Sequence, residues 1–200
     1  MIKPASLEDE YFVVLTLKGK VLRLANRIQK MIAEHYKIYN GDNYPVLHLT
    51  IDRIDKNKLK EADKTLKDIV KDFKAIQIRI DELNCMKISQ DNNLLVIDVE
   101  DTKSLLNSAK IIHQNLYKKN ISTIDNYKDW NFHITIINNN FAVNPVSEED
   151  FSDICYLLED FKVPYTSYAN NLEIWQASLD PNDRVLKKYN LPDREENDEL

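Results

Sequence analysis

The apolar residues of the chain follow two different periods, and stretches of strand-like and helix-like pattern take turns along its length. β-Branched and aromatic runs predict strands at residues 11–17, 46–54, 75–84, 94–99 and 132–137, with one or two more within 163–178. Apolar positions three and four residues apart predict helices at 20–39, 58–71, 102–118 and from 147 to about 160. Strands and helices that alternate in this way are typical of a domain that mixes both.

The order of these elements repeats within the chain. Each half contains a strand, then a helix, then a second strand. At an offset of 83 residues, Leu22 of the first helix corresponds to Leu105, and Ile28 corresponds to Ile111. This correspondence is weak by itself, and it gains weight from the strand that ends each repeat.

That closing strand carries the same pattern in both halves, a histidine, an apolar residue, a threonine and a second apolar residue. The two copies are HLTI at 48–51 and HITI at 133–136, so the histidines are 85 positions apart. Because residues i and i+2 of a strand point to the same face, each copy presents an imidazole and a hydroxyl together. Either motif alone is explained by strand propensity, but two motifs in register with a repeat favour a functional site.

The paired motifs suit chemistry at phosphorus. Displacement there needs a base for the attacking oxygen and an acid for the leaving oxygen, and histidine serves either role near neutral pH. Threonine hydroxyls can donate hydrogen bonds to the other phosphate oxygens. The two glycines, Gly19 and Gly41, are too far apart for a glycine-rich phosphate loop, so side chains would hold the phosphate.

With these motifs the chain resembles the 2H phosphoesterases. The stretch 172–179 (LEIWQASL), which continues to Tyr189 and Leu191, is similar to the closing strand of the 2′-5′ RNA ligase-like members, also known as RNA 2′,3′-cyclic phosphodiesterases. Many members have a proline close to the second motif, whereas here Asn131 and Phe132 precede the histidine. This departure concerns the shape of the loop more than the chemistry.

The resemblance implies an α+β fold, a bilobal pseudo-two-fold duplication in which two antiparallel sheets line a central cleft with helices outside. Residues 1–191 would form this single domain, with lobes that mix both halves of the chain. Residues 192–200 would form a disordered acidic tail. By the resemblance, His48 and His133 are the acid and base, while Thr50 and Thr135 hold the phosphate. Which histidine is the base stays open.

The expected function is that of a metal-independent phosphodiesterase that needs no cofactor. It would hydrolyse 2′,3′-cyclic phosphate or 2′-5′ bonds in small nucleotides or RNA ends, and reverse ligation is conceivable for such an enzyme. Two alternatives stay open. One is a hydrolase of cyclic oligonucleotide signals of the anti-defence type, and the other is a module of the same fold that binds a nucleotide without turning it over.

Aromatic residues near the motifs are candidates for substrate binding. Tyr44 and Trp130 lie in the polar segments that lead into the two histidines, where they would either stack on a nucleobase or anchor the loops. Arg53 is one residue off the face of His48 and is expected to point away from it.

Three further polar residues have ordinary explanations. Asp52 is two positions beyond Thr50, so alternation puts it on the same face, where it either tunes His48 or marks the solvated end of the strand. His35 is expected to be a partly buried helical histidine. His113 flanks an apolar helix position and receives no role.

Charge and cysteine content limit partners and location. The net charge is −6, and residues 192–200 account for −4 of it, which leaves a nearly neutral body. A small nucleotide or oligonucleotide therefore fits as a partner, and a long duplex does not. Cys85 and Cys155 form no metal-binding pair and no disulfide framework, and reduced thiols are expected. Without an apolar leader or a membrane-length apolar run, a cytoplasmic monomer is expected.

Overall fold

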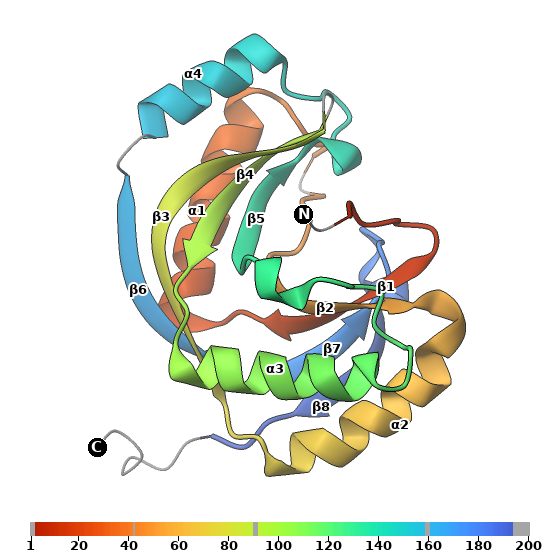
Figure 1. Cartoon of the computed structure of the whole chain (residues 1–200). Coiled ribbons are helices and arrows are strands. Elements are labelled where there is room, and N and C mark those ends of the chain that lie inside the picture. Colours follow the sequence, from red (N-terminus) through yellow and green to blue (C-terminus); the bar gives the residue numbers. More distant parts are fainter. Residues whose placement is uncertain (1–2, 42, 90–91, 159–160, 194–200) are drawn as a thin grey trace.

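The computed structural model describes residues 3–41, 43–89, 92–158 and 161–193. Eight strands of this part form one antiparallel sheet in the order β6-β3-β4-β5-β2-β1-β7-β8 (Figure 1). The strands are β1 (Glu10–Thr16), β2 (His48–Asp55), β3 (Ile76–Ser89), β4 (Asn92–Val99), β5 (His133–Asn138), β6 (Lys162–Ala169), β7 (Asn171–Trp175) and β8 (Val185–Asn190). The helices are α1 (Gly19–His35), α2 (Leu59–Ile69), α3 (Lys103–Tyr117), α4 (Glu148–Leu158) and the short α5 (Pro181–Arg184).

The strand order contains two halves related by pseudo-symmetry. One half is β2-β1-β7-β8, the other is β5-β4-β3-β6, and the repeated strands β2 and β5 meet in the middle. The sequence was expected to form two separate sheets. In the structure the halves are instead joined through the pairing of Leu49 with Ile134, because β2 and β5 run antiparallel beside each other. This junction is short, since Leu49 with Ile134 is the single ladder pair between these two strands within the described residues.

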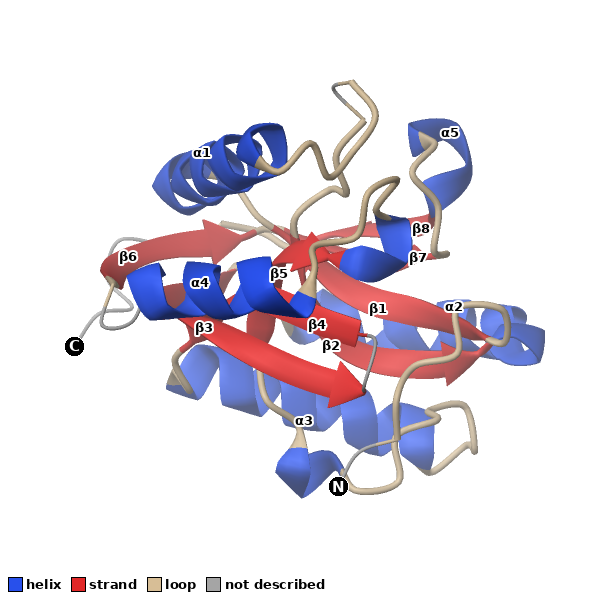
Figure 2. Cartoon of the chain, turned by 90° about the horizontal axis from the view of Figure 1, so that it is seen from above, coloured by secondary structure: helices blue, strands red, loops and turns tan. Residues whose placement is uncertain are grey.

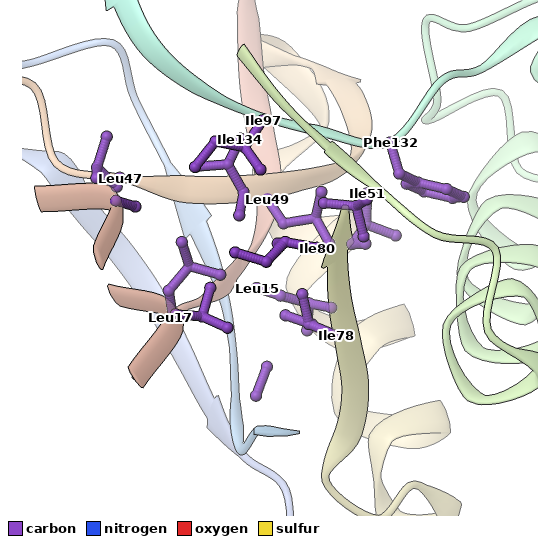
Figure 3. Close-up of a cluster of buried hydrophobic side chains, with 14 of the residues drawn as sticks. Leu15, Leu17, Leu47, Leu49, Ile51, Ile78, Ile80, Ile97, Phe132 and Ile134 are labelled. Atoms are coloured by element: carbon purple, nitrogen blue, oxygen red, sulfur yellow. The ribbon is translucent and has the colours of Figure 1, made fainter. Parts of the chain in front are cut away.

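A shared hydrophobic core lies on one face of the two halves. Figure 3 shows side chains from β1 and β2 pointing toward side chains from β3, β4 and β5. Leu49 and Ile134, the apolar residues between each histidine and threonine, are both fully buried in this cluster. The apolar half of each motif therefore holds the core together, and its histidine and threonine lie on the opposite face.

Helices close the core on opposite sides. Figure 2 shows α1 on one side of the strands and α2 and α3 on the other. Helix α1 buries Ile28 and Ile32 of its predicted apolar stripe together with Ala25, but Met31 of that stripe is exposed. Helix α3 buries Leu105 and Ile112. The Thr102 hydroxyl accepts a hydrogen bond from the Leu105 amide, as expected for an N-cap.

The C-terminal part differs most from the prediction. The stretch 163–178 contains most of β6 and all of β7, as expected, but α5 and β8 follow without having been predicted. Pro192 and Asp193, assigned to the tail, contact the fold, since Ala75 N donates to Pro192 O at 2.7 Å and Asp193 lies 3.8 Å from Lys18 Nζ. The remaining tail, 194–200, lies outside the described residues. No described helix has the length and apolar character needed to cross a membrane.

The cysteines correct the expectation of reduced thiols. Cys85 of β3 and Cys155 of α4 form a disulfide, although 70 positions separate them in sequence. Helix α4 packs against β3 and β4, and this packing brings the two Cα atoms to 6.0 Å, a separation that suits a disulfide. Composition alone could not predict the pairing because it depends on where α4 docks.

Candidate active site

The two histidines lie at the junction of the half-sheets. Because Leu49 pairs with Ile134 in antiparallel strands, His48 lies across from Thr135, and Thr50 lies across from His133. All four side chains are partly exposed, whereas the apolar residues between them are buried. The structure thus brings the four residues of the two motifs together on one face.

Both imidazoles are held by the same hydrogen bond. His48 Nδ1 donates to Val46 O at 2.8 Å, and His133 Nδ1 donates to Asn131 O at 3.0 Å. In each case the acceptor is the carbonyl two residues earlier. This bond fixes the ring orientation and, in the neutral ring, leaves Nε2 with its lone pair free for proton transfer.

The surrounding protein favours the neutral form of both rings. The pKa of His48 is lowered to about 4, chiefly by burial, with smaller contributions from the charges of His133 and Arg184, while the hydrogen bond to Val46 opposes the shift. Burial also lowers the pKa of His133, but its hydrogen bond to Asn131 and the negative charge of Asp98 both act in the opposite direction. The two histidines therefore differ in electrostatic environment despite their matching geometry.

The threonines have free hydroxyls. Within the described part of the chain, neither Thr50 Oγ1 nor Thr135 Oγ1 has a hydrogen-bond partner in the fold. Their positions beside the histidine of the opposite strand place two donors and two imidazoles around one small region. Such a region can accept an anion with several oxygens, such as a phosphate.

Each motif ends in a one-residue register shift. Val14 of β1 pairs with Thr50 and Val13 pairs with Asp52, so that Ile51 is skipped. In the other half, β4 pairs with Thr135 and then Ile137, so that Ile136 is skipped. An extra residue of this kind reverses the alternation of side chains beyond it. The motif and the shift are duplicated together.

Side chains from loops and helices bind the carbonyls that the shifts leave available. Tyr127 Oη donates to Ile51 O at 2.7 Å, and Gln29 Nε2 donates to Ile136 O at 3.1 Å. Trp130 Nε1 donates to Thr50 O at 3.3 Å. These bonds support β2 and β5 where the two strands no longer pair with each other.

The position of Asp52 contradicts both of its predicted roles. The register shift turns it to the face opposite His48, where it is fully buried. There Asp52 accepts hydrogen bonds from His113 Nδ1 at 3.0 Å and Ser122 Oγ at 2.7 Å. His113, which had received no role from the sequence, is therefore the buried hydrogen-bond partner of the Asp52 carboxylate. Its ring also stacks on that of Tyr127, with the ring centroids 3.9 Å apart.

Arg53 also differs from its prediction. The shift returns it to the face of Thr50, and its guanidinium lies over the Trp130 ring at 5.7 Å. Arg53 NH1 also contacts Glu10 at 3.4 Å. Arg53 lines a cavity of about 630 Å³ whose other residues come from the N-terminal segment and the loops near Asp55 and Thr123, away from the two motifs.

The two aromatic candidates occupy different surroundings. Trp130 Nε1 donates to the backbone carbonyl of Thr50 and the ring lies parallel to Tyr127, so Trp130 is anchored at the first motif. Tyr44 lies edge-on to Tyr39 at 5.9 Å, and Tyr39 is itself bonded to the end of β5. These contacts agree with loop anchoring.

Three residues near the histidines were not singled out from the sequence. The Trp175 ring lies 4.8 Å from that of His48, and the Arg184 guanidinium lies 4.8 Å from the Trp175 ring. Asp98 of β4 is in register with His133. Trp175 falls in the stretch that carried the resemblance, whereas Arg184 has no signal in the sequence, because α5 and β8 bring it into place.

The remaining histidine lies apart from the site. His35, expected to be partly buried, is exposed at the end of α1 and packs edge-on against Tyr36. Across the described ranges, no three histidine, cysteine, aspartate or glutamate side chains are grouped as a metal site would require.

Comparison with solved structures gives the same fold at low sequence identity. The chain matches a Thermus thermophilus protein, TT0787, at 14% identity and a TM-score of 0.63, covering 93% of this chain and 100% of that one. It matches E. coli LigT complexed with 3′-AMP at 14% identity and a TM-score of 0.59 (92% and 98% covered), and the MHV ns2 PDE domain at 15% and 0.55 (85% and 99% covered). No curated protein sequence matches the chain.

The duplicated fold and the paired motifs define a protein of the 2H phosphoesterase class. Within this class, a family model described as the AKAP7 2'5' RNA ligase-like domain matches residues 10–182. The chain belongs to that family.

Proposed function

We propose that the protein is a metal-independent phosphodiesterase that hydrolyses 2′,3′-cyclic phosphate or 2′-5′ phosphodiester bonds in small nucleotides or RNA ends. One observation carries the proposal. Two imidazoles, each held through Nδ1 by the carbonyl two residues earlier, lie across a strand pair from two threonines without hydrogen-bond partners among the described residues. This arrangement supports acid–base catalysis with Nε2 of each ring as the reacting atom.

With a cyclic phosphate as substrate, water is the attacking group in the proposed reaction. A neutral histidine takes a proton from water while the water oxygen forms a bond to phosphorus. The P–O bond to one ribose oxygen breaks, and the second histidine, which starts protonated, gives its proton to that oxygen. The product is a phosphomonoester beside a free hydroxyl, and exchange with solvent restores both rings. Thr50 and Thr135 donate hydrogen bonds to the oxygens that do not react.

The charges around the rings favour one assignment of roles in hydrolysis. His48, whose pKa is lowered to about 4 and which has a cation nearby, is suited to be the neutral base. His133 has Asp98 beside it, and this negative charge favours the protonated ring of an acid. The rate should then fall at low pH as His48 is protonated and at high pH as His133 loses its proton, which makes a bell-shaped profile.

Small nucleotides fit this site better than long nucleic acids. E. coli LigT forms complexes with 3′-AMP, ATP and NADP+, all of which are small nucleotides. We propose the same ligand class for this chain, with Trp130 and Tyr44 as candidate contacts to the base. Trp130 is the stronger candidate because its hydrogen bond to Thr50 O places it at the motif.

The test is a substrate screen carried out in EDTA. 2′,3′-Cyclic mononucleotides, 2′-5′-linked oligonucleotides and cyclic oligonucleotides are incubated with the wild type, His48→Ala and His133→Ala. We expect turnover of the first two classes in chelator and a loss of about 10²–10⁴ in kcat/KM for each variant. His35→Ala is the matched control, since it removes an exposed histidine outside the site and should keep full activity.

Three results would contradict the proposal. Activity that disappears in EDTA and returns with a divalent ion would rule out metal-independent chemistry. Turnover of cyclic oligonucleotides alone would favour hydrolysis of such signals. Tight retention of unchanged nucleotide by the wild type over long incubation would favour a binding module.

A further inference from the structure

The two histidines have matching geometry but neighbours of opposite charge. Arg184 is linked to His48 through Trp175, whose ring contacts both the His48 ring and the Arg184 guanidinium at 4.8 Å. Asp98 lies across from His133 in the strand register. The duplication of the fold does not require this difference, because neither residue belongs to the repeated motif.

Arg184 is held in a defined place. Its guanidinium stacks on Trp175, a favourable position for a cation on an indole ring. Trp175 is itself almost fully buried, and its Nε1 donates to Glu173 Oε2 at 2.6 Å. The Arg184 backbone is fixed too, since its amide donates to Asp180 O and its carbonyl accepts from Gln176 N. The side chain is thus preorganised rather than free to move.

Part of the hydrogen-bonding capacity of Arg184 has no partner among the described residues. Its Nε is buried without a partner, and no carboxylate among the described residues pairs with it. The basic residues of β8, the strand that follows Arg184, are engaged, Lys187 with Asp63 at 3.7 Å and Lys188 with Glu173 at 3.6 Å. A buried donor without a partner is costly unless a ligand completes it, and a guanidinium matches the oxygens of a phosphate.

Asp98 places a negative charge beside His133, opposite in sign to the charge of Arg184 near His48. Its Oδ1 is buried without a partner, while Oδ2 accepts from Asn84 at 3.1 Å. A second anionic group of a substrate would be repelled near Asp98 and attracted near Arg184. A ligand that carries more than one phosphate would therefore bind in one orientation only.

We propose that Arg184 binds a second phosphate of the substrate, next to the one that reacts, and so selects nucleotides with at least two phosphates over a single cyclic mononucleotide. This proposal rests on the proposed function, since it takes the region between His48 and His133 as the place of the reacting phosphate. The four motif side chains serve that phosphate. Arg184 is not one of these four residues. It binds the neighbouring phosphate, and Trp175 positions its guanidinium.

The test measures binding of product-like ligands that need no turnover. By calorimetry, the wild type is titrated with a nucleoside 3′-monophosphate and with a dinucleotide that ends in the same 3′-phosphate. We expect the dinucleotide to bind at least about tenfold more tightly, and Arg184→Gln to remove this advantage, weakening the dinucleotide by about 10- to 100-fold. Binding of the monophosphate should stay the same, and Arg184→Lys should restore part of the advantage.

Lys187→Gln is the matched control. It removes one positive charge three positions beyond Arg184, but Lys187 pairs with Asp63 of α2, and Asp63 keeps Lys67 and Tyr189 as partners. Both ligands should bind this variant as they bind the wild type. Thermal unfolding of each variant checks that the fold is intact.

The possible results separate this proposal from the proposed function. If Arg184→Gln weakens both ligands equally, its guanidinium acts on the terminal phosphate, and the proposal is overturned. Equal affinity of the wild type for the two ligands overturns it as well. If the binding pattern holds while no substrate is turned over, the phosphodiesterase function fails and the second-phosphate site stands.

Discussion

The halves of the sheet around His48 and around His133 share a scaffold but differ in charge. In both, the imidazole is held by the carbonyl two residues earlier, and the strand shifts register directly after the motif. Near His48 the charged neighbour is Arg184, and beside His133 it is Asp98. The comparison shows that backbone geometry and electrostatics are separable. The geometry is the same in both halves, whereas the charges give each histidine a different electrostatic environment.

The largest effect should come from removing either imidazole. His48→Ala and His133→Ala should each lower kcat/KM by about 10²–10⁴, because the scaffold remains but a proton-transfer group is lost. The double variant should lose little more than either single one if the two act as a unit. Steady-state kinetics on the best substrate of the screen measures this. A variant that keeps near-full activity would show that only one half is catalytic.

The next largest effect concerns the half that contains β5. Only this half has a helix joined to its sheet by a disulfide within the described residues, through Cys85 and Cys155. Because the bond closes a long loop in the unfolded chain, reduction should lower the free energy of unfolding by about 2–4 kcal/mol. Chemical denaturation with and without reductant measures the difference. The double variant Cys85→Ser/Cys155→Ser, whose stability should not respond to reductant, is the control.

The third effect concerns the residue beyond each register shift. Asp52 in one half corresponds to Ile137 in the other, and both are buried. Asp52→Asn should destabilise the fold by about 1–3 kcal/mol, because His113 and Ser122 lose a charged acceptor. Ile137→Val removes one methylene and should cost about 0.5–1.5 kcal/mol. Denaturation curves compare them, and an unchanged stability in Asp52→Asn would show that the buried cluster contributes little.

Asp52 also shows where prediction from sequence ends. Strand alternation correctly placed His48 with Thr50 on one face and Leu49 in the core, because the period of two holds within the motif. It failed two residues later, since an extra residue in one strand reverses the faces and leaves no mark in the composition. One shift therefore misplaced both Asp52 and Arg53.

Other features depend on packing between distant segments. The twin motifs and the repeat indicated the fold and its family, and the family match confirms that identification. The joining of the halves into one sheet, the disulfide and the place of Arg184 were not predictable in this way. The first two require segments far apart in sequence to meet, such as β3 with α4, and local pattern carries no information about such contacts. Arg184 is close to Trp175 in sequence, but its place depends on the turn through α5, which the pattern did not predict.

The smallest effect should come from Asp98→Asn, which alters charge with little change of shape. Asp98 raises the pKa of His133, so its removal should lower that pKa further. If His133 acts as the protonated acid, the alkaline limb of the pH–rate profile moves to lower pH, while the acid limb set by His48 stays in place. Arg184→Gln should act on the other limb, since loss of its charge raises the pKa of His48 and moves the acid limb to higher pH. Profiles of kcat/KM for the wild type and both variants measure the limbs separately. Movement of the same limb in both variants would show that the two charges do not distinguish the histidines.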